Sequence, residues 1–403
     1  MRLQHDLLNL QDIQEHARRR LPKGIYEWIE RGAEDDEAIR NNRQAFRQLK
    51  LKTRVLVDVS ERSSRTTLFG KPLAVPLAVA PTAAAGLVWF RGELELAKAA
   101  AAEGIPYTLA TRSTSSIEEV AAEAPGTLWF QLYVWAERSL SYSLVDRAKA
   151  AGFEALLVTV DVPVEPNREF NRRNGFSLPF VPTIPSMANM LMHPAWLLGV
   201  MGRYIATTGM PRYENLKGEH KEQITRGGVT RTATRQDNLT WDDIRELRRR
   251  WPGKLLVKGI LRPQDALRAV EIGADGVVVS NHGGRCLDSA VATIDALPDV
   301  ADAIGHRATI LLDSGVRRGT DMAKALALGA KAVLVGRPCL YGLSLAGKPG
   351  AQRVVELLRS ELLTTMGQVG CATVDDLGSD LIVPAVASAT RNHTQRERDL
   401  YAH

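Results

Sequence analysis

The stretch GVVVSNHGG, residues 276 to 284, places an apolar β-branched run directly before a histidine and two glycines. A valine run of this length beside glycine is typical of a strand that is buried on both faces. Seven more such runs occur between residues 77 and 337, with amphipathic helical stretches between them. The eight runs are LAVAP 77–81, IPYTLA 105–110, LWFQLYV 128–134, ALLVTVD 155–161, KLLVKG 254–259, GVVVSN 276–281, TILLDS 309–314 and AVLVGR 332–337.

Alternating strands and helices indicate an α/β protein with a parallel sheet, and eight strands are the number that closes a barrel. We therefore predict one domain over residues 1–403, a (β/α)8 TIM barrel with an N-terminal helical extension at roughly residues 8–50. The fourth and fifth runs are about 90 residues apart, where the other connections take about 15 to 25. This spacing predicts a long inserted loop at residues 165–240.

The first half of the insertion, residues 186–210, holds five of the chain's eight methionines. A helix needs about 20 uninterrupted apolar residues to cross a bilayer, and His193, Pro194 and Arg203 interrupt this segment. We expect it to lie on a membrane without spanning it; a lid over the site or a contact between subunits is the alternative. The polar second half, residues 217–238, is expected to be a mobile surface segment.

The composition indicates a folded protein, because 45% of the residues are hydrophobic and only 24% are charged. The cysteines Cys286, Cys339 and Cys371 are too few and too widely spaced for a disulfide framework or a metal site. No export signal is apparent at the N-terminus. We expect an intracellular protein without a bound metal, in the cytoplasm or at the cytoplasmic side of the membrane.

The net charge of +6 and the pI near 9.2 would suit an anionic partner. The basic runs HARRR (16–20) and RELRRR (245–250) have helical apolar spacing and no interleaved aromatic residues. We interpret them as solvated helix faces and expect no nucleic-acid partner.

Polar side chains stand at the end of most of the predicted strands, which is where barrel enzymes carry catalytic groups. A buried polar group without a partner costs about 1–3 kcal/mol, so their accumulation indicates a site. The polar residues are Gln131, Tyr133, Thr159, Asp161, Lys258, Ser280, His282, Arg285, Asp313 and Arg337, and Gly336 precedes the last of them.

His282 is the candidate acid/base group. Asp161, from another strand, could orient the imidazole and raise its basicity, and Arg285 could hold an anion. A structural histidine is the alternative. Lys258 is expected to be a charge partner of a bound cofactor, with a surface cation as the alternative.

Two neighbouring loops predict a phosphate site. DSGVRRGTD (313–321) and GRPCLYG (336–342) combine glycines with Arg317 and Arg337 at helix starts, where backbone amides bind anions. Ordinary helix-entry glycines with surface arginines are the alternative.

Together the motifs resemble the FMN-dependent 2-hydroxyacid dehydrogenase/oxidase family, most closely its mandelate dehydrogenase and membrane-associated L-lactate dehydrogenase members. The resemblance rests on LPKGIYEWIERGAEDD (21–36), FQLYV, LLVTVDVPV, LLVKGI, SNHGGRCLD (280–288), LDSGVRRGTD and KALALGAKAVLVGRP, which occur in the family's order. It implies FMN as cofactor and a tetramer as assembly.

The resemblance also implies roles for single residues. His282 would be the general base, with Asp161 stabilising the imidazolium. Arg285 and Arg168 would hold the substrate carboxylate, and Tyr133 would contact substrate and flavin. The remaining contacts to FMN would come from Lys258 near N1, Gln131, Thr159, Ser280 and the backbone around Ala83, and at the ribityl phosphate from Asp313, Arg317, Gly336 and Arg337.

The chain departs from the family pattern at three positions. Trp28 stands where relatives have a tyrosine that binds the substrate carboxylate, so substrate choice is in question. Ala110 replaces a serine near the flavin, and Cys286 replaces a residue that is often glutamine.

The expected function is FMN-dependent oxidation of an (S)-2-hydroxy acid, mandelate-like or lactate-like, to the 2-oxo acid. A membrane acceptor such as a quinone would take the electrons. The main alternative is a soluble oxidase that reduces oxygen to hydrogen peroxide. An FMN isomerase and a binding module without catalysis are more distant alternatives.

Overall fold

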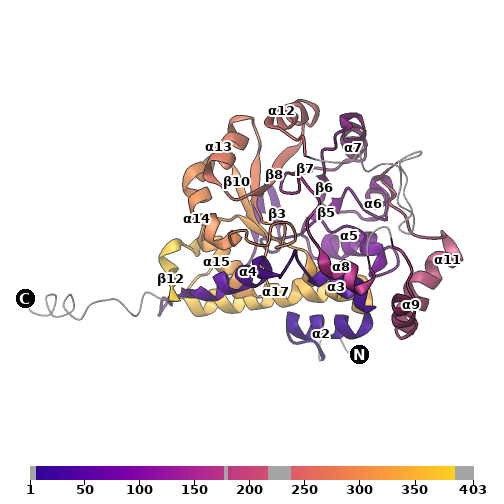
Figure 1. The fold of residues 1–403 in the computed structure, drawn as a ribbon. Coiled ribbons are helices and arrows are strands. Elements are labelled where there is room, and N and C mark those ends of the chain that lie inside the picture. The colour runs from indigo at the N-terminus through magenta and orange to yellow at the C-terminus, as the bar shows by residue number, and fades with distance from the viewer. Residues whose placement is uncertain (1–5, 177–179, 217–236, 386–403) are drawn as a thin grey trace, which may run out of the picture.

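A closed barrel of eight parallel strands forms the centre of the computed structural model, which describes residues 6–176, 180–216 and 237–385 (Figure 1). The strand order is β10-β11-β4-β5-β6-β7-β8-β9, and β9 closes the ring onto β10. The predicted barrel is confirmed, and each strand overlaps one of the eight expected runs. The strands are β4 Leu77–Val79, β5 Tyr107–Ala110, β6 Leu128–Leu132, β7 Ala155–Thr159, β8 Lys254–Ile260, β9 Gly276–Val279, β10 Thr309–Leu312 and β11 Ala332–Val335.

Helices surround the barrel because each strand buries both of its faces. On β7, for example, Leu156 and Val158 point outward to the helices, whereas Ala155 and Leu157 point into the barrel. The surrounding helices are α5 Gly92–Ala102, α6 Ile117–Glu123, α7 Arg138–Ala150, α12 Trp241–Arg250, α13 Pro263–Glu271, α14 Thr293–Ile304, α15 Gly319–Ala327, α16 Arg337–Ala346 and α17 Lys348–Val369.

The N-terminal extension forms the helices α2 Leu10–Arg20, α3 Lys23–Glu30 and α4 Glu37–Gln48, as the sequence predicts. It is tied to the loop after β9. The amides of Asn42 and Asn281 hydrogen-bond to each other at 2.8 and 2.9 Å, and Asp288 accepts the backbone N–H of Ala38 at 3.1 Å. These contacts bring the end of α3 to the mouth of the barrel.

Two small antiparallel ladders were not expected from the sequence. The hairpin of β2 Thr66–Leu68 and β3 Lys71–Leu73 lies at the N-terminal end of the barrel, where the ring of Phe69 packs edge-on against Trp129 at 6.1 Å. The strands β1 Leu49–Leu51 and β12 Ile382–Pro384 pair with each other. Strands of three residues are too short to show an alternating pattern.

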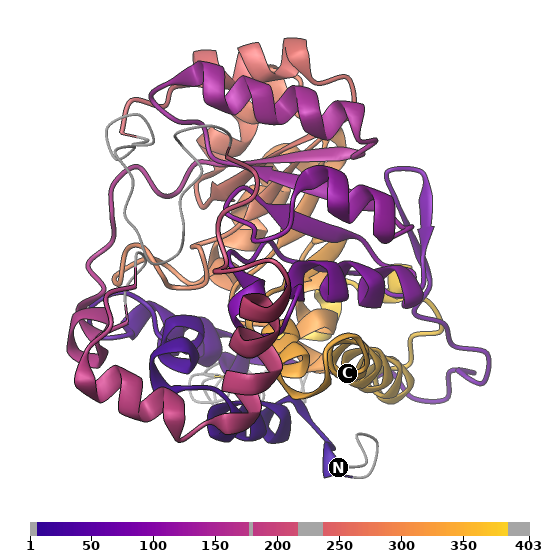
Figure 2. The ribbon, with the colours of Figure 1, turned by 90° about the vertical axis from the view of Figure 1, so that its right-hand side faces the viewer.

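The inserted connection is not simply a loop, which corrects the prediction for residues 165–240. Within its described part it forms α8 Glu169–Asn174, α9 Ile184–Leu191, α10 Pro194–Trp196, a π-helical turn Leu197–Gly202 and α11 Arg203–Thr207. Figures 1 and 2 show α9 and α11 projecting at one side of the barrel. Among the described helices, none has both the length and the apolar character that crossing a bilayer requires. The polar segment 217–238 lies outside the described residues except for Asp237 and Asn238.

The two basic runs lie on exposed helix faces, as predicted. Glu15 pairs with Arg18 and Arg19 on α2, and Glu246 pairs with Arg249 and Arg250 on α12. The three cysteine thiols, all within the described ranges, are free.

Candidate active site

Side-chain alternation along the strands sets a group of polar residues inside the mouth of the barrel. Successive residues of a strand point to opposite faces, so residues two apart share a face. The inward apolar residues are Trp129, Leu157, Leu256, Val278 and Leu311. The inward positions two residues further along are Gln131, Thr159, Lys258, Ser280 and Asp313, all buried.

These buried polar groups are paired with one another. Gln131 Nε2 donates to Thr159 Oγ1 at 2.9 Å. Lys258 Nζ lies 3.1 Å from Asp313 Oδ2 and donates to Ser280 Oγ at 2.9 Å. Burial by itself lowers the pKa of Lys258, but Asp313 and then Asp161 outweigh it and the pKa is raised. Lys258 therefore keeps a fixed positive charge in the mouth.

His282 and Asp161 form a hydrogen-bonded pair, with Nδ1 and Oδ1 2.8 Å apart. Burial lowers the pKa of His282 more than Asp161 raises it, so the imidazole is neutral near pH 7. Burial opposes ionisation of Asp161, but His282 and Lys258 outweigh it and the pKa of Asp161 is lowered. The pair is thus a neutral base beside a carboxylate, and its second nitrogen, Nε2, is available for chemistry.

The backbone around this pair is strained. His282 has a φ of 56°, and Gly283 and Gly284 continue in the left-handed region. Gly259 has a φ of 109°, and a Cβ there would lie 2.6 Å from Asp161 Cβ. Non-glycine residues rarely adopt positive φ, and such strain gathers at functional sites. The glycine of LLVKG is therefore needed to seat the carboxylate.

Two arginines are held by the C-terminal end of α3. Arg285 Nη1 donates to the carbonyls of Trp28, Ile29 and Arg31 at 2.7–3.1 Å. Arg337 Nε donates to Ile29 O at 2.9 Å. The last carbonyls of a helix have no partner within the helix, so they can accept hydrogen bonds from side chains. Because a carbonyl carries no net charge, it fixes each guanidinium group without neutralising it, and the positive charge can still attract an anion.

Within the described ranges, the arginines of the mouth, Arg168, Arg285 and Arg337, form no ion pair with a carboxylate, whereas Lys258 is paired with Asp313. Arg168 donates to the carbonyl of Arg285 at 3.3 Å. Burial, then Arg168 and Arg337, lowers the pKa of Arg285 well below its usual range. Burial also lowers the pKa of Arg337. Buried like charges of this kind are stabilised when an anion binds between them.

The structure contains buried polar atoms that find no partner among the described residues. They include Thr82 Oγ1, Asp161 Oδ2 and Arg337 Nη2, all at the C-terminal mouth of the barrel. Thr82 lies next to Gly336, since a Cβ at Gly336 would be 3.4 Å from Thr82 Cγ2. Buried polar groups are normally satisfied, so the Thr82 hydroxyl and the Arg337 guanidinium fit a polar, anionic cofactor such as FMN.

The remaining predicted residues line the same mouth or its rim. Tyr133 follows β6 and is half-buried, and burial, then Asp161, raises its pKa. The Trp28 ring lies 5.7 Å from the Arg285 guanidinium and 6.5 Å from the ring of Phe176. Ala83 lies in the loop after β4, and Arg317 begins the approach to α15, where its backbone N–H bonds Asp321 at 2.9 Å.

Sequence reasoning missed two residues of this site. Ser314, with a φ of 74°, joins two loops because its Oγ accepts the N–H of Gly283 at 2.9 Å and donates to Asp313 at 2.7 Å. Thr82 directly follows the predicted strand run 77–81, and its hydroxyl carried no separate signal in the sequence. The position of Ser314 directly after Asp313 was the available signal, but its role depends on the path of a different loop.

Comparison with known proteins gives a consistent result. The family model described as FMN-dependent dehydrogenase matches residues 17–384. The chain is 38% identical to (S)-mandelate dehydrogenase of Pseudomonas putida over 94% of this chain and 95% of that protein. It is 42% identical to L-lactate oxidase of Nostoc sp., over 93% and 98%. A crystal structure of the monotopic membrane protein (S)-mandelate dehydrogenase superposes with a TM-score of 0.89 at 38% identity, covering 94% of this chain and all of that one.

The contact of Gly259 with Asp161 can be tested by Gly259→Ala, with Gly152→Ala as the matched control. Both glycines have positive φ, but a Cβ at Gly152 meets nothing within 4 Å. We expect Gly259→Ala to lower the free energy of unfolding by about 2 kcal/mol more than Gly152→Ala, because a clash adds to the backbone strain. Urea unfolding measures both, and equal losses would contradict the proposed crowding.

Proposed function

Because the chain belongs to the FMN-dependent dehydrogenase family, its cofactor is FMN, and we propose that it oxidises an (S)-2-hydroxy acid to the 2-oxo acid. The substrate would be mandelate-like or lactate-like, and the electrons would pass to a membrane acceptor such as a quinone. The observation that carries this proposal is the His282–Asp161 pair, 2.8 Å apart, in a mouth that also holds the Arg285 and Arg168 guanidinium groups.

The chain's own residues supply the acid/base chemistry. A substrate carboxylate held by Arg285 and Arg168 would bring its 2-hydroxyl group to His282, whose free Nε2 takes the hydroxyl proton. The imidazolium that results is stabilised by Asp161. Because burial lowers the pKa of His282, the base is ready in its neutral form.

We assign FMN to the same mouth. When bound, FMN supplies a two-electron acceptor. Lys258 would provide the positive charge that favours an anionic reduced ring, and Gln131, Thr159, Ser280 and the backbone around Ala83 would contact the ring. Asp313, Arg317, Gly336 and Arg337 would hold the ribityl chain and phosphate, supported by the unpartnered Nη2 of Arg337.

A ring-bearing substrate is favoured by the aromatic side chains beside the arginines. The Trp28 ring lies 5.7 Å from the Arg285 guanidinium, and Phe176 packs behind it with ring centroids 6.5 Å apart. The Trp28 indole offers edge and face contacts to a phenyl group that a small methyl group would not fill. This supports a mandelate-like acid over a lactate-like one.

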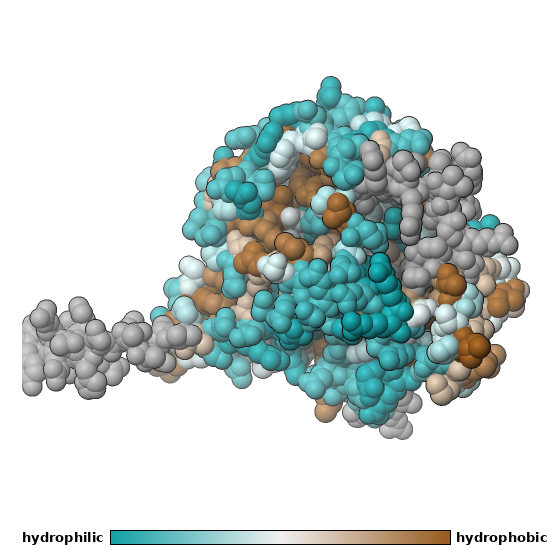
Figure 3. Space-filling model, viewed as in Figure 1, coloured by the Kyte–Doolittle hydropathy of each residue, from teal (hydrophilic) through white to brown (hydrophobic). Residues whose placement is uncertain are grey.

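Contact with a membrane is supported by the outer face of the inserted segment. Its large apolar side chains are exposed, and Figure 3 shows brown surface where Figure 1 draws α9 and α11. Large exposed apolar patches mark interaction sites, and a one-sided apolar face suits the bilayer interface. The residues are Val181, Ile184, Met187, Leu191, Met192, Leu198 and Ile205.

The function is tested by anaerobic bleaching of the flavin absorption band with a panel of 2-hydroxy acids. We expect (S)-mandelate to bleach the band faster than L-lactate or glycolate. Absence of bleaching with every acid would refute the oxidation.

Admitting air to the reduced enzyme distinguishes oxygen from a membrane acceptor. Reoxidation of the flavin within about a second is expected of an oxidase, and slower reoxidation is expected of a dehydrogenase.

The role of Asp161 is tested by the pH dependence of kcat/KM. His282 must be neutral to act as a base, so kcat/KM falls at acid pH. Because the pKa of His282 is lowered, this fall occurs below the ordinary pKa of histidine. In Asp161→Asn the carboxylate no longer raises the pKa of His282, so we expect this acid-side fall to move to lower pH while the plateau falls about 100-fold or more. Asp275→Asn, at a carboxylate paired with Lys254 away from the mouth, is the control and should leave both unchanged. If the acid-side fall of kcat/KM in Asp161→Asn moved to higher pH instead, Asp161 would not be raising the pKa of His282.

Membrane contact is tested with the double variant Leu198→Glu/Ile205→Glu and vesicles of phosphatidylcholine and phosphatidylglycerol. Both side chains are about two-thirds exposed, so the fold should be unaffected. We expect co-sedimentation with vesicles to fall at least about tenfold, because two apolar contacts are replaced by charges. Val55→Glu, an exposed apolar position outside the insertion, is the control. Equal binding of all three proteins would rule out this face.

A further inference from the structure

The inserted segment has a second, inward face that contacts the loop between β4 and α5. Trp196, Val200 and Tyr204 are four residues apart and buried, whereas Leu198 and Ile205 point outward. Trp196 Nε1 donates to Leu87 O at 2.7 Å, and the Tyr204 ring lies 4.8 Å from that of Phe90. Spacing of this kind gives a helix two opposite faces. The inner face therefore rests on residues 87–90 of the barrel.

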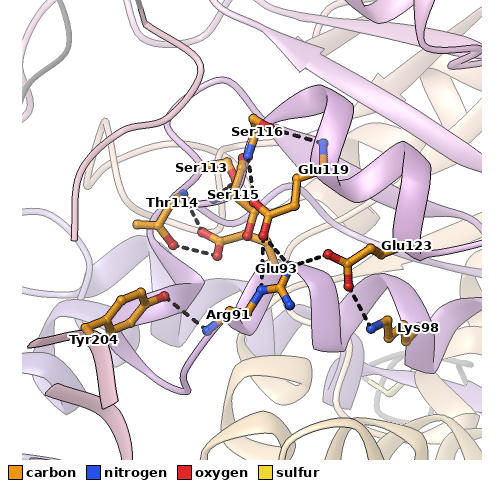
Figure 4. Close-up of polar contacts among 10 residues, drawn as sticks. All are labelled: Arg91, Glu93, Lys98, Ser113, Thr114, Ser115, Ser116, Glu119, Glu123 and Tyr204. Atoms are coloured by element: carbon orange, nitrogen blue, oxygen red, sulfur yellow. Dashed lines mark hydrogen bonds and ion pairs between the residues drawn. The ribbon is translucent and has the colours of Figure 1, made fainter. Parts of the chain in front are cut away.

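The phenol of Tyr204 reaches further into this loop. It accepts the backbone N–H of Arg91 at 3.1 Å (Figure 4). A Cβ at Gly86 would lie only 2.5 Å from the phenol oxygen. Burial, then Glu93, raises the pKa of Tyr204 to about 12, so its hydroxyl keeps its proton. Thr114 Oγ1 lies on the same side of this loop, because a Cβ at Gly86 would be 2.1 Å from it.

Glu93, in the first turn of α5, fixes Thr114. Its carboxylate is fully buried and accepts both the backbone N–H and the hydroxyl of Thr114, at 2.9 and 2.7 Å (Figure 4). Gly86 of the β4–α5 loop therefore lies against two supports, the Tyr204 phenol and Thr114, which is fixed by Glu93.

The loop held by these contacts needs outside support. Ala84 and Arg91, near its two ends, both have positive φ without being glycine. Conformations of this kind persist only where surrounding contacts hold them. The loop also carries Thr82, whose hydroxyl is buried without a described partner beside Gly336. It is the same loop whose backbone we assign to FMN.

We propose that Tyr204, Thr114 and Glu93 are positioning residues that hold the β4–α5 loop in its FMN-binding shape. The inserted segment is then part of the support of the cofactor site as well as an outer surface. This inference rests on the assignment of FMN to the barrel mouth, and it does not depend on which substrate or acceptor the enzyme uses.

The test is release of FMN from the holoenzyme on dilution, followed by the fluorescence of free FMN. Tyr204→Phe removes the acceptor of the Arg91 N–H, and Glu93→Gln and Thr114→Val weaken the Glu93–Thr114 contact, so we expect the Kd for FMN to rise about tenfold in each. Thr114→Ser keeps the hydroxyl and should retain FMN with nearly wild-type affinity. The visible spectrum of bound FMN should shift in the three disrupted variants and not in Thr114→Ser.

Matched controls separate positioning from general stability. Tyr142→Phe changes a tyrosine of α7 that lies under Arg250, and Glu103→Gln changes a nearly buried glutamate that accepts from Gln352 at the end of α5. Both should leave the Kd for FMN unchanged.

The inference would be overturned if Tyr204→Phe and Thr114→Val bound FMN with unaltered affinity, even if their free energy of unfolding were lower. If the wild type fails to oxidise any 2-hydroxy acid, the proposed function fails while this measurement remains valid.

Discussion

Closure of eight parallel strands into a barrel is the constraint on which the site depends. Each strand must alternate inward and outward, and the interior is already filled by Trp129, Leu157 and their neighbours. The next inward position on each strand is the last before solvent. Polar residues there are buried yet close enough to pair, as Lys258 does with Asp313. The barrel thus gathers groups that are distant in sequence without a dedicated binding loop.

The N-terminal extension supplies what the barrel lacks, a neutral support for cations. The carbonyls at the end of α3 hold Arg285 and Arg337, and these dipoles fix the guanidinium groups without cancelling their charge. Carboxylates in the same place would have formed closed ion pairs. The mouth therefore keeps an excess of positive charge, which a carboxylate substrate and a phosphate-bearing cofactor can both use.

The insertion between β7 and β8 carries two faces with different chemistry. Its outer side chains are exposed and apolar, and its inner side chains pack on the β4–α5 loop. A single short helical segment therefore links the surface proposed to meet a membrane to the loop proposed to meet FMN. The arrangement explains why Trp196 and Tyr204 are buried in a segment that is otherwise unusually exposed.

The sequence alone determined the barrel and the residues at its strand ends, because apolar runs, alternation and glycine positions are local signals that each strand carries by itself. It also identified the His282–Asp161 pair, although their 2.8 Å contact is seen only in the structure. Only the tertiary structure decided that α3 supports Arg285, that Ser314 bridges two loops, and that Tyr204 meets the backbone of Arg91. These contacts join residues up to 257 positions apart, and no local pattern encodes the paths of the loops that bring them together.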